Sequence, residues 1–261
     1  MKHMKTLDVE IVGRVAVITL NRPKSANGIN FELASELADV AQQCDHDSMV
    51  KSVLLTGSGR FFSAGGDIKE MASHGDDVGV KIKELADRLH MAISTFSKMK
   101  APLVIAVNGM AAGAGFSLSL TGDIVIASDK ASFMMAYTKA GLSPDGSSSY
   151  YLPRLVGIRR AQDLMLTNKQ LSAEQALDWG LVTEVVEDGE LFERAMSVAK
   201  MLAEGSARSN YVVKKLLLSS FNNSLETQME IESREISHCA GSKDGREGIA
   251  AFMAKRNPVF E

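Results

Sequence analysis

The feature that most constrains this chain is a stretch from Pro102 to Gly146 in which an apolar run leads directly into a segment of small residues. Residues 103–107 are short, apolar and β-branched, and an Asn-Gly pair follows them, so they predict a buried strand. Residues 111–120 predict a helix that begins at a Gly-Ala-Gly sequence. Each glycine there costs a helix up to ~1 kcal/mol relative to alanine, but it lets another group approach the backbone closely.

Two explanations fit this junction. A strand, a tight turn and a helix N-terminus present free N–H groups to a ligand that carries negative charge; alternatively, the small residues allow close packing of the helix on the strand. A second segment, Phe62-Ser-Ala-Gly-Gly66, also places small residues where backbone must approach something closely. Asp67 follows it, and Ile68 begins a possible helix.

The rest of the pattern alternates strands with helices, which predicts an α/β fold. We expect a hairpin over residues 9–20, strands at 50–56, 123–127 and 181–186, and helices at 31–44, 80–99, 147–155, 161–166 and 172–179. The polar residues 75–79 predict a mobile interruption. From residue 191 four helices follow one another, at 191–205, 209–221, 224–239 and 246–255. We therefore expect a core over residues 1–190 and, over 191–261, a helical region that covers the active site or forms oligomers.

Composition excludes several classes of protein. A net charge of −3 gives no electrostatic reason to expect a nucleic-acid partner. The two cysteines, Cys44 and Cys239, lie far apart without metal-binding spacing, so we expect no metal site and a reducing, cytoplasmic setting. No window approaches the length of a membrane span, and the N-terminal residues 1–7 lack the apolar core of a signal peptide, so we expect no membrane partner.

Six motifs occur in this order along the chain: Asn21-Arg-Pro23, Phe62-Ser-Ala-Gly-Gly-Asp-Ile68, Ala106-Val-Asn-Gly-Met-Ala-Ala-Gly-Ala-Gly115, Gly122-Asp123, Ser172-Ala-Glu-Gln-Ala176 and Trp179-Gly-Leu-Val182. Together they resemble the enoyl-CoA hydratase/isomerase, or crotonase, superfamily, and the likeness extends to Phe252-Met-Ala-Lys-Arg-Asn-Pro-Val-Phe260. The resemblance implies a ClpP-like spiral of β-β-α units and a helical C-terminal region that builds homotrimers, often paired into hexamers. It also implies an acyl-CoA thioester as substrate, with coenzyme A as part of that substrate and no metal or redox cofactor.

The resemblance gives the two glycine segments a chemical role. Thioester chemistry at the α-carbon passes through an enolate, and two backbone N–H groups aimed at its oxygen form an oxyanion hole. By position in the motifs, these donors would be the amides of Gly66 and Ala114. Hydratases of the superfamily also use two glutamates, but the corresponding positions here are Ser117 and Tyr137. Neither side chain replaces an ionised base at neutral pH, so we expect slow or absent hydration.

One carboxylate remains in the right region, Asp145. Its position matches the aspartate of the superfamily's isomerases, including ring-epoxyphenylacetyl-CoA and Δ3,Δ2-enoyl-CoA isomerases. It also matches the nucleophile of 4-chlorobenzoyl-CoA dehalogenases, in which a histidine on the preceding long helix activates water; His90 lies at that place and Tyr137 replaces a tryptophan. A proton shift needs one base, and the flanking Ser-Pro-Asp-Gly favours the isomerases. The alternatives are a dehalogenase-like hydrolase, a hydratase and a non-catalytic acyl-CoA binder.

Coenzyme A would need cations near its phosphates and an apolar slot for adenine. The candidate cations are Arg22 and Lys24 in the first loop, and Lys255 and Arg256 in the C-terminal tail. By the resemblance, the segment that contains Ala64, Asp67 and Ile68 would also bind the coenzyme. The acyl group is not specified by these motifs.

Overall fold

The computed structural model describes residues 4–261, and within them the strands form a six-stranded and a four-stranded sheet. Residues 1–3, part of the segment for which we expect no signal peptide, lie outside the described residues. In the larger sheet the first two strands are antiparallel and all later neighbours are parallel. Its spatial order is β1 (Leu7–Val12), β2 (Val15–Leu20), β3 (Ser52–Gly57), β5 (Leu103–Val107), β7 (Ile124–Ser128) and β10 (Glu184–Val186).

The smaller sheet is built from very short strands, each of the first three following a strand of the larger sheet along the chain. Its order is β4 (Phe61–Ser63), β6 (Met110–Ala112), β8 (Ser132–Met134) and β9 (Leu171–Ser172). Strands β3 and β4 lead into α2 (Ile68–Ser73), and β5 and β6 lead into α4 (Ala114–Ser119). This succession of strand, strand and helix is the expected spiral of β-β-α units, so the fold class is confirmed.

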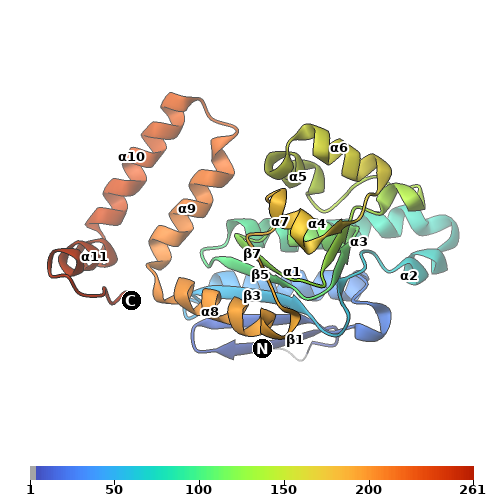
Figure 1. Cartoon of the computed structure of the whole chain (residues 1–261), viewed down its shortest axis with the longest axis horizontal. Coiled ribbons are helices and arrows are strands. Elements are labelled where there is room, and N and C mark those ends of the chain that lie inside the picture. The colour runs from blue at the N-terminus through green and yellow to red at the C-terminus, as the bar shows by residue number, and fades with distance from the viewer. Residues whose placement is uncertain (1–3) are drawn as a thin grey trace.

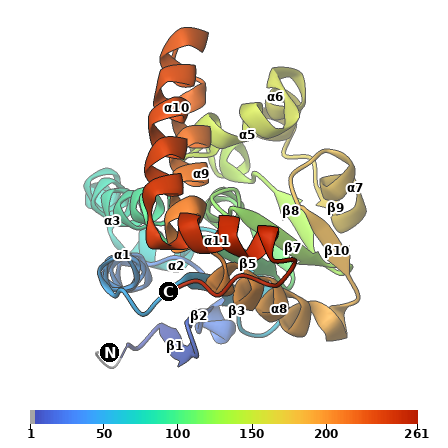
Figure 2. The ribbon, with the colours of Figure 1, turned by 90° about the vertical axis from the view of Figure 1, so that its left-hand side faces the viewer.

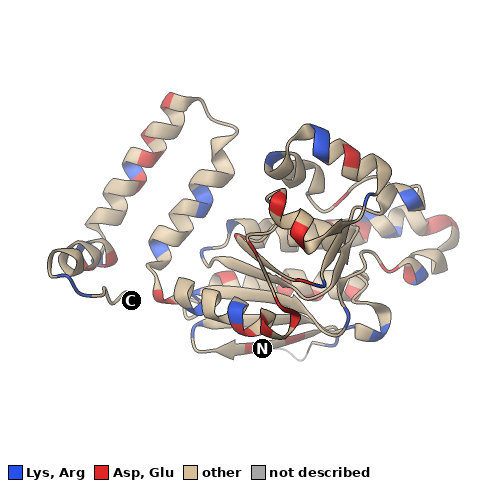
Figure 3. Ribbon diagram, in the orientation of Figure 1, with Lys and Arg blue, Asp and Glu red and all other residues tan. Residues whose placement is uncertain are grey.

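Helices cover both faces of the larger sheet (Figure 1). Alternate residues of β5 separate the faces: Leu103, Ile105 and Val107 pack in the main core, whereas Val104 and Ala106 face α8. The sequences of β3, β5 and β7 contain no charged residue, as expected for strands buried on both sides, and the charges gather on helices and loops (Figure 3). The main helices of the α/β part are α1 (Phe31–His46), α3 (Val78–Lys98), α5 (Ser148–Val156), α6 (Ile158–Thr167), α7 (Ala173–Asp178) and α8 (Leu191–Glu204).

Helix starts follow the expected capping chemistry. The Asn30 side chain accepts a hydrogen bond from the Leu33 amide at the start of α1. Ser172 and Gln175 form a reciprocal capping box at the start of α7. Helix α1 packs along α3, and this pair forms one wall of the main core.

The last three helices extend away from the sheets (Figures 1 and 2). They are α9 (Ala207–Ser220), α10 (Leu225–Gly241) and α11 (Lys243–Met253). Helix α8, by contrast, packs on the larger sheet through Leu191, Ala195 and Ala199. The chain therefore leaves the core after α8, about fifteen residues beyond the boundary at 190 that the sequence suggested. That the C-terminal region covers the active site or forms oligomers remains a prediction.

Three sequence-based expectations are wrong in detail. The helix expected over residues 111–120 is shorter, because Ala111 and Ala112 pair with β4 and β8 before α4 begins at Ala114. The interruption at 75–79 is largely helical: Gly75–Asp77 form a 3-10 turn, and α3 begins at Val78. Only the last three residues of the 181–186 segment pair with β7.

Candidate active site

The two small-residue segments meet at the start of α4. Gly65 (φ +94°) and Gly113 (φ +49°) both have left-handed backbone conformations that glycine adopts without strain. A Cβ atom on Gly65 would lie 2.8 Å from the carbonyl oxygen of Ala112 and 3.3 Å from the amide nitrogen of Ala114. The glycines therefore serve both explanations raised by the sequence, because they permit close packing and bring two backbone amides together.

Gly66 and Ala114 line the same cavity, of about 490 Å³. Neither amide donates a hydrogen bond to another group among residues 4–261. Ala114 is the first residue of α4, and the first amides of a helix have no partner within it. Two unpaired donors on the wall of one cavity can bind an oxygen that carries negative charge.

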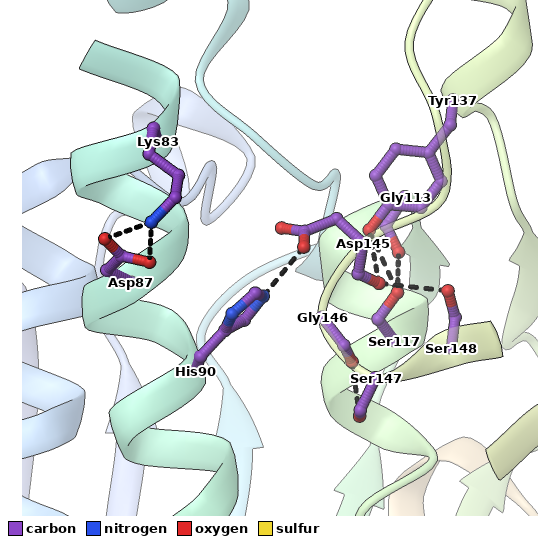
Figure 4. Close-up of polar contacts among 10 residues, drawn as sticks. All are labelled: Lys83, Asp87, His90, Gly113, Ser117, Tyr137, Asp145, Gly146, Ser147 and Ser148. Carbon is purple, nitrogen blue, oxygen red and sulfur yellow. Dashed lines mark hydrogen bonds and ion pairs between the residues drawn. The ribbon is translucent and has the colours of Figure 1, made fainter. Parts of the chain in front are cut away.

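The cavity lies between α2, α3 and the segment 136–145, and its lining is largely apolar. Among the described lining residues, Asp145 is the one acid, and Lys83 and Lys139 are the cations. Lys83 pairs with Asp87 on α3, at 2.6 Å (Figure 4). The apolar side chains of the wall come mainly from Ile68, Met71, Ile82, Leu85, Leu89 and Leu142.

Asp145 and His90 are in direct contact. His90 on α3 reaches across to the loop before α5, and its Nε2 lies 2.7 Å from Asp145 Oδ1 (Figure 4). The His90 side chain is 48% exposed and the Asp145 side chain 35% exposed. The structure thus brings together two candidates that are 55 residues apart in the sequence.

The backbone of Asp145 is held by two hydroxyls. Its carbonyl oxygen accepts hydrogen bonds from Ser148 Oγ at 2.9 Å and from Tyr137 Oη at 3.2 Å. Tyr137 Oη also lies 2.9 Å from Ser117 Oγ (Figure 4). Burial raises the pKa of the Tyr137 phenol, although the Ser117 hydrogen bond opposes this shift, so the phenol stays protonated. These contacts fix the loop while leaving the Asp145 carboxylate free to face the cavity.

A family model described as enoyl-CoA hydratase/isomerase matches residues 10–261. The chain belongs to this family. A 1,2-epoxyphenylacetyl-CoA isomerase of Escherichia coli (strain K12) is 40% identical over 251 residues, covering 94% of each chain. A 4-chlorobenzoyl coenzyme A dehalogenase-2 of an Arthrobacter species is 31% identical over 250 residues, covering 95% of this chain and 91% of that one. A crystal structure of an enoyl-CoA hydratase from Polaromonas sp. JS666 superposes with a TM-score of 0.94 at 30% identity, covering 98% and 99% of the two chains.

The first-loop and α2 residues that the sequence suggested for binding coenzyme A form two groups, one at the cavity wall and one in an ion pair. Ala64 and Ile68 line the cavity. Arg22 and Asp67 instead bind each other, with Arg22 Nη2 at 2.9 Å from Asp67 Oδ2, and Arg22 also donates to the carbonyl of Gly28. Partial burial opposes ionisation of Asp67, but hydrogen bonds from Arg22 and from the amides at the start of α2 outweigh it and lower its pKa. The pair joins the first loop to α2.

The remaining cations lie away from the cavity. Lys24 lies exposed in the 3-10 turn Pro23–Ser25. Lys255 and Arg256 follow α11, at the opposite end of the molecule from α2 (Figure 1), and Arg256 pairs with Glu247 at 2.6 Å. Within one chain the tail therefore does not reach the cavity. The cations at its wall are Lys83 and Lys139, which the motifs did not identify; Lys83 lies one residue from Ile82, in the apolar stripe of the long helix.

The described residues also bear on cofactors and membranes. Nowhere in residues 4–261 do three His, Cys, Asp or Glu side chains gather in a way that could hold a metal ion. In the same part of the chain, no helix is both long and apolar enough to cross a membrane. Two of the relatives are named for coenzyme A compounds, a 1,2-epoxyphenylacetyl-CoA isomerase and a 4-chlorobenzoyl coenzyme A dehalogenase-2.

Proposed function

We propose that the protein is an acyl-CoA isomerase in which Asp145 is the single base. The observation that supports this most strongly is the composition of the cavity wall: two unpaired amides and, among the described residues, one carboxylate. A 1,3 proton shift needs one group that removes a proton from one carbon and returns it to another. A hydration by the family's two-glutamate route would need two carboxylates, which this wall does not supply.

The proposed reaction uses the geometry as follows. The thioester oxygen binds to the amides of Gly66 and Ala114, and Asp145 takes a proton from a carbon of the acyl chain. The electrons of that C–H bond move into the enolate, whose oxygen is stabilised by the two amides; each such donor is typically worth about 10²–10³ in rate. Asp145 then returns a proton to another carbon, and the double bond reforms at a new position. The apolar wall keeps water from the enolate.

A second candidate is a hydrolase of the dehalogenase type, and the contact between His90 and Asp145 favours it. In that reaction the Asp145 carboxylate attacks a carbon of an aryl thioester and displaces the leaving group, and His90 activates water against the resulting aspartyl ester. The relative at 31% identity carries that name. We favour the isomerase because the relative at 40% identity is named an isomerase, and because a proton shift needs no histidine.

Two assays test the proposal. Purified protein should convert 3-hexenoyl-CoA to 2-hexenoyl-CoA, and Asp145→Asn should lower the rate by about 10²–10⁴. His90→Gln, which retains a hydrogen-bond donor, should lose far less than Asp145→Asn. Incubation of His90→Gln with 4-chlorobenzoyl-CoA followed by mass spectrometry tests the second candidate. A covalent adduct on Asp145 would replace the isomerase by the hydrolase, and thermal stabilisation by acyl-CoA without turnover of any thioester would favour a non-catalytic binder.

We also propose that helices α9–α11 pack against other copies of the chain. They carry a set of exposed apolar side chains that a monomer would leave in water. Light scattering should give the mass of a trimer or a hexamer, and Phe252→Glu should lower it; a monomer at micromolar concentration would contradict the proposal. The exposed side chains are Leu217, Phe221, Leu225, Met229, Ile236, Ile249, Phe252 and Met253.

A further inference from the structure

The hydrogen bond between His90 and Asp145 lies where two cavities adjoin. Asp145 lines the cavity with the two free amides, whereas His90 lines a second one of about 770 Å³. The second cavity lies between α3, the start of α5 and α9, and many of its lining residues carry hydroxyl groups. These are Ser94, Ser97, Ser147, Tyr150, Tyr151, Tyr211 and Ser219. The cavity is open to solvent, so water reaches the hydroxyl groups along its wall.

The atoms of the pair are arranged for proton movement between the cavities. Asp145 Oδ1 contacts His90 Nε2 at 2.7 Å, and Oδ2 accepts no hydrogen bond from the residues that the structure describes. Oδ2 is therefore available to a substrate carbon. The other ring nitrogen of His90, Nδ1, has no hydrogen-bond partner within residues 4–261, and about half of the side chain is exposed.

His90 is the one hydrogen-bonded link to this carboxylate among the described residues. Tyr137 and Ser148, the other polar side chains on Asp145, both bind its backbone carbonyl oxygen. Neither can therefore receive a proton from the carboxyl group through an existing hydrogen bond. Imidazole has a donor and an acceptor on opposite sides of one ring and exchanges protons near neutral pH.

We propose that His90 exchanges the proton carried by Asp145 with water in the second cavity while the enolate is present. This inference rests on the isomerase function proposed above. The carboxyl group gives its proton to Nε2, Nδ1 releases one to water, and a solvent proton returns by the reverse route. Charge and proton count are unchanged over the cycle, but the proton delivered to the product carbon comes from solvent. His90 acts through Asp145: it positions the carboxylate and determines how fast its proton exchanges with solvent.

Deuterium content of the product, counted per turnover, tests the inference independently of rate. Wild-type protein and 3-hexenoyl-CoA in D₂O should give 2-hexenoyl-CoA that carries deuterium, measured by mass spectrometry at early conversion and corrected with an enzyme-free sample. His90→Gln keeps a hydrogen bond to Asp145 but cannot relay a proton, and its product should contain at least about fivefold less deuterium. Ser94→Ala is the matched control, because Ser94 lines the second cavity one helical turn from His90; its product should match that of the wild type within about twofold.

The outcomes separate this inference from the proposed function. Equal deuterium in the products of wild type and His90→Gln, or none in the wild-type product, would overturn the exchange role. Complete loss of turnover in both His90→Gln and His90→Asn, each folded by circular dichroism, would also overturn it, because internal return of the proton needs no relay. If wild-type protein isomerises no enoyl-CoA at all, the proposed function fails before any label is counted.

Discussion

The hydroxyl oxygens of Tyr137 and Ser117 lie 2.9 Å apart, and these are the two positions at which family hydratases carry glutamates in the resemblance described above. Ser117 is fully buried and Tyr137 is partly buried, and burial raises the pKa of the tyrosine and so holds it in its protonated form. The Cβ atom of Ser117 also lies 2.9 Å from where a Cβ on Gly146 would be, so the site of the first glutamate is filled by the loop that carries Asp145. At these two positions the hydroxyls of Ser117 and Tyr137 contact each other, and Tyr137 also holds the backbone of Asp145.

Hydration of crotonyl-CoA should therefore be slow or undetectable. Neither hydroxyl supplies an ionised base, and the described residues 4–261 place no second carboxylate at the cavity wall. The loss of absorbance of the conjugated thioester at saturating substrate measures this directly. Turnover on the order of 10 s⁻¹ or more, the ordinary range for enzymes, would mean that another group acts as the base.

Replacing Ala114 by proline tests the oxyanion hole. Proline has no N–H group, and the first position of a helix tolerates it. Ala114→Pro should lower the rate of isomerisation by about 10²–10³ while circular dichroism shows a folded protein. Ala114→Ser keeps the N–H group at the same position and serves as the control. Equal rates for the two variants would exclude the Ala114 amide as a donor.

The sequence predicted the larger sheet well because its central strands are five or six residues long, uncharged and rich in Val, Ile and Leu. It did not predict the smaller sheet, whose strands have two or three residues and show no usable periodicity. That omission also explains the misplaced start of α4, since β6 occupies Met110–Ala112 immediately before it.

The residues of the candidate site could be predicted from the sequence, but the contacts between them could not. Gly66, Ala114 and Asp145 could be named because each belongs to a local motif, and all three line one cavity. The contact between His90 and Asp145 could not be predicted, since it depends on how α3 packs beside a loop 55 residues away. The ion pair between Arg22 and Asp67 could not be predicted either, because the order of charges in a sequence does not show which side chains pair in the fold.

The Arg22–Asp67 pair should make stability depend on pH in the acid range. The folded-state pKa of Asp67 lies below its ordinary value of 3.8, so its contribution is fully present above that value and is lost as pH falls through the folded-state pKa. Arg22→Gln should cost about 1 kcal/mol of unfolding free energy near pH 6. The difference from wild type should shrink as the pH falls below 3.8 through the lowered folded-state pKa of Asp67. Urea unfolding at several pH values measures it, with the exposed Lys24→Gln as control; a difference that grows with acidity would contradict the assignment.

An ion pair between a buried lysine and a partly exposed aspartate joins the C-terminal helices to the core. Lys214 on α9 donates to the carbonyl oxygens of Phe96 and Ala101 at 2.9 and 3.1 Å, and its Nζ lies 2.7 Å from Asp123 Oδ2. The Lys214 side chain is 6% exposed. Burial lowers the pKa of Lys214 and raises that of Asp123, and each charge opposes the shift of the other. Each residue therefore keeps its charge partly because the other is charged.

Removing one member of this pair should cost much more than removing both. Lys214→Met leaves two backbone carbonyls and the partly exposed Asp123 carboxylate without their donor, and should lower the unfolding free energy by about 2–3 kcal/mol. The double variant Lys214→Met/Asp123→Asn should lose less than the sum of the two single variants, because no unpaired charge remains. Lys215→Met is the matched control: the adjacent lysine pairs with Glu235 at the surface, and its loss should be far smaller. Urea unfolding at fixed protein concentration gives all four values. If Lys214→Met and Lys215→Met were equally stable, or if the single losses simply added, Lys214 would not be the anchor that holds α9 against the ends of α3 and β5.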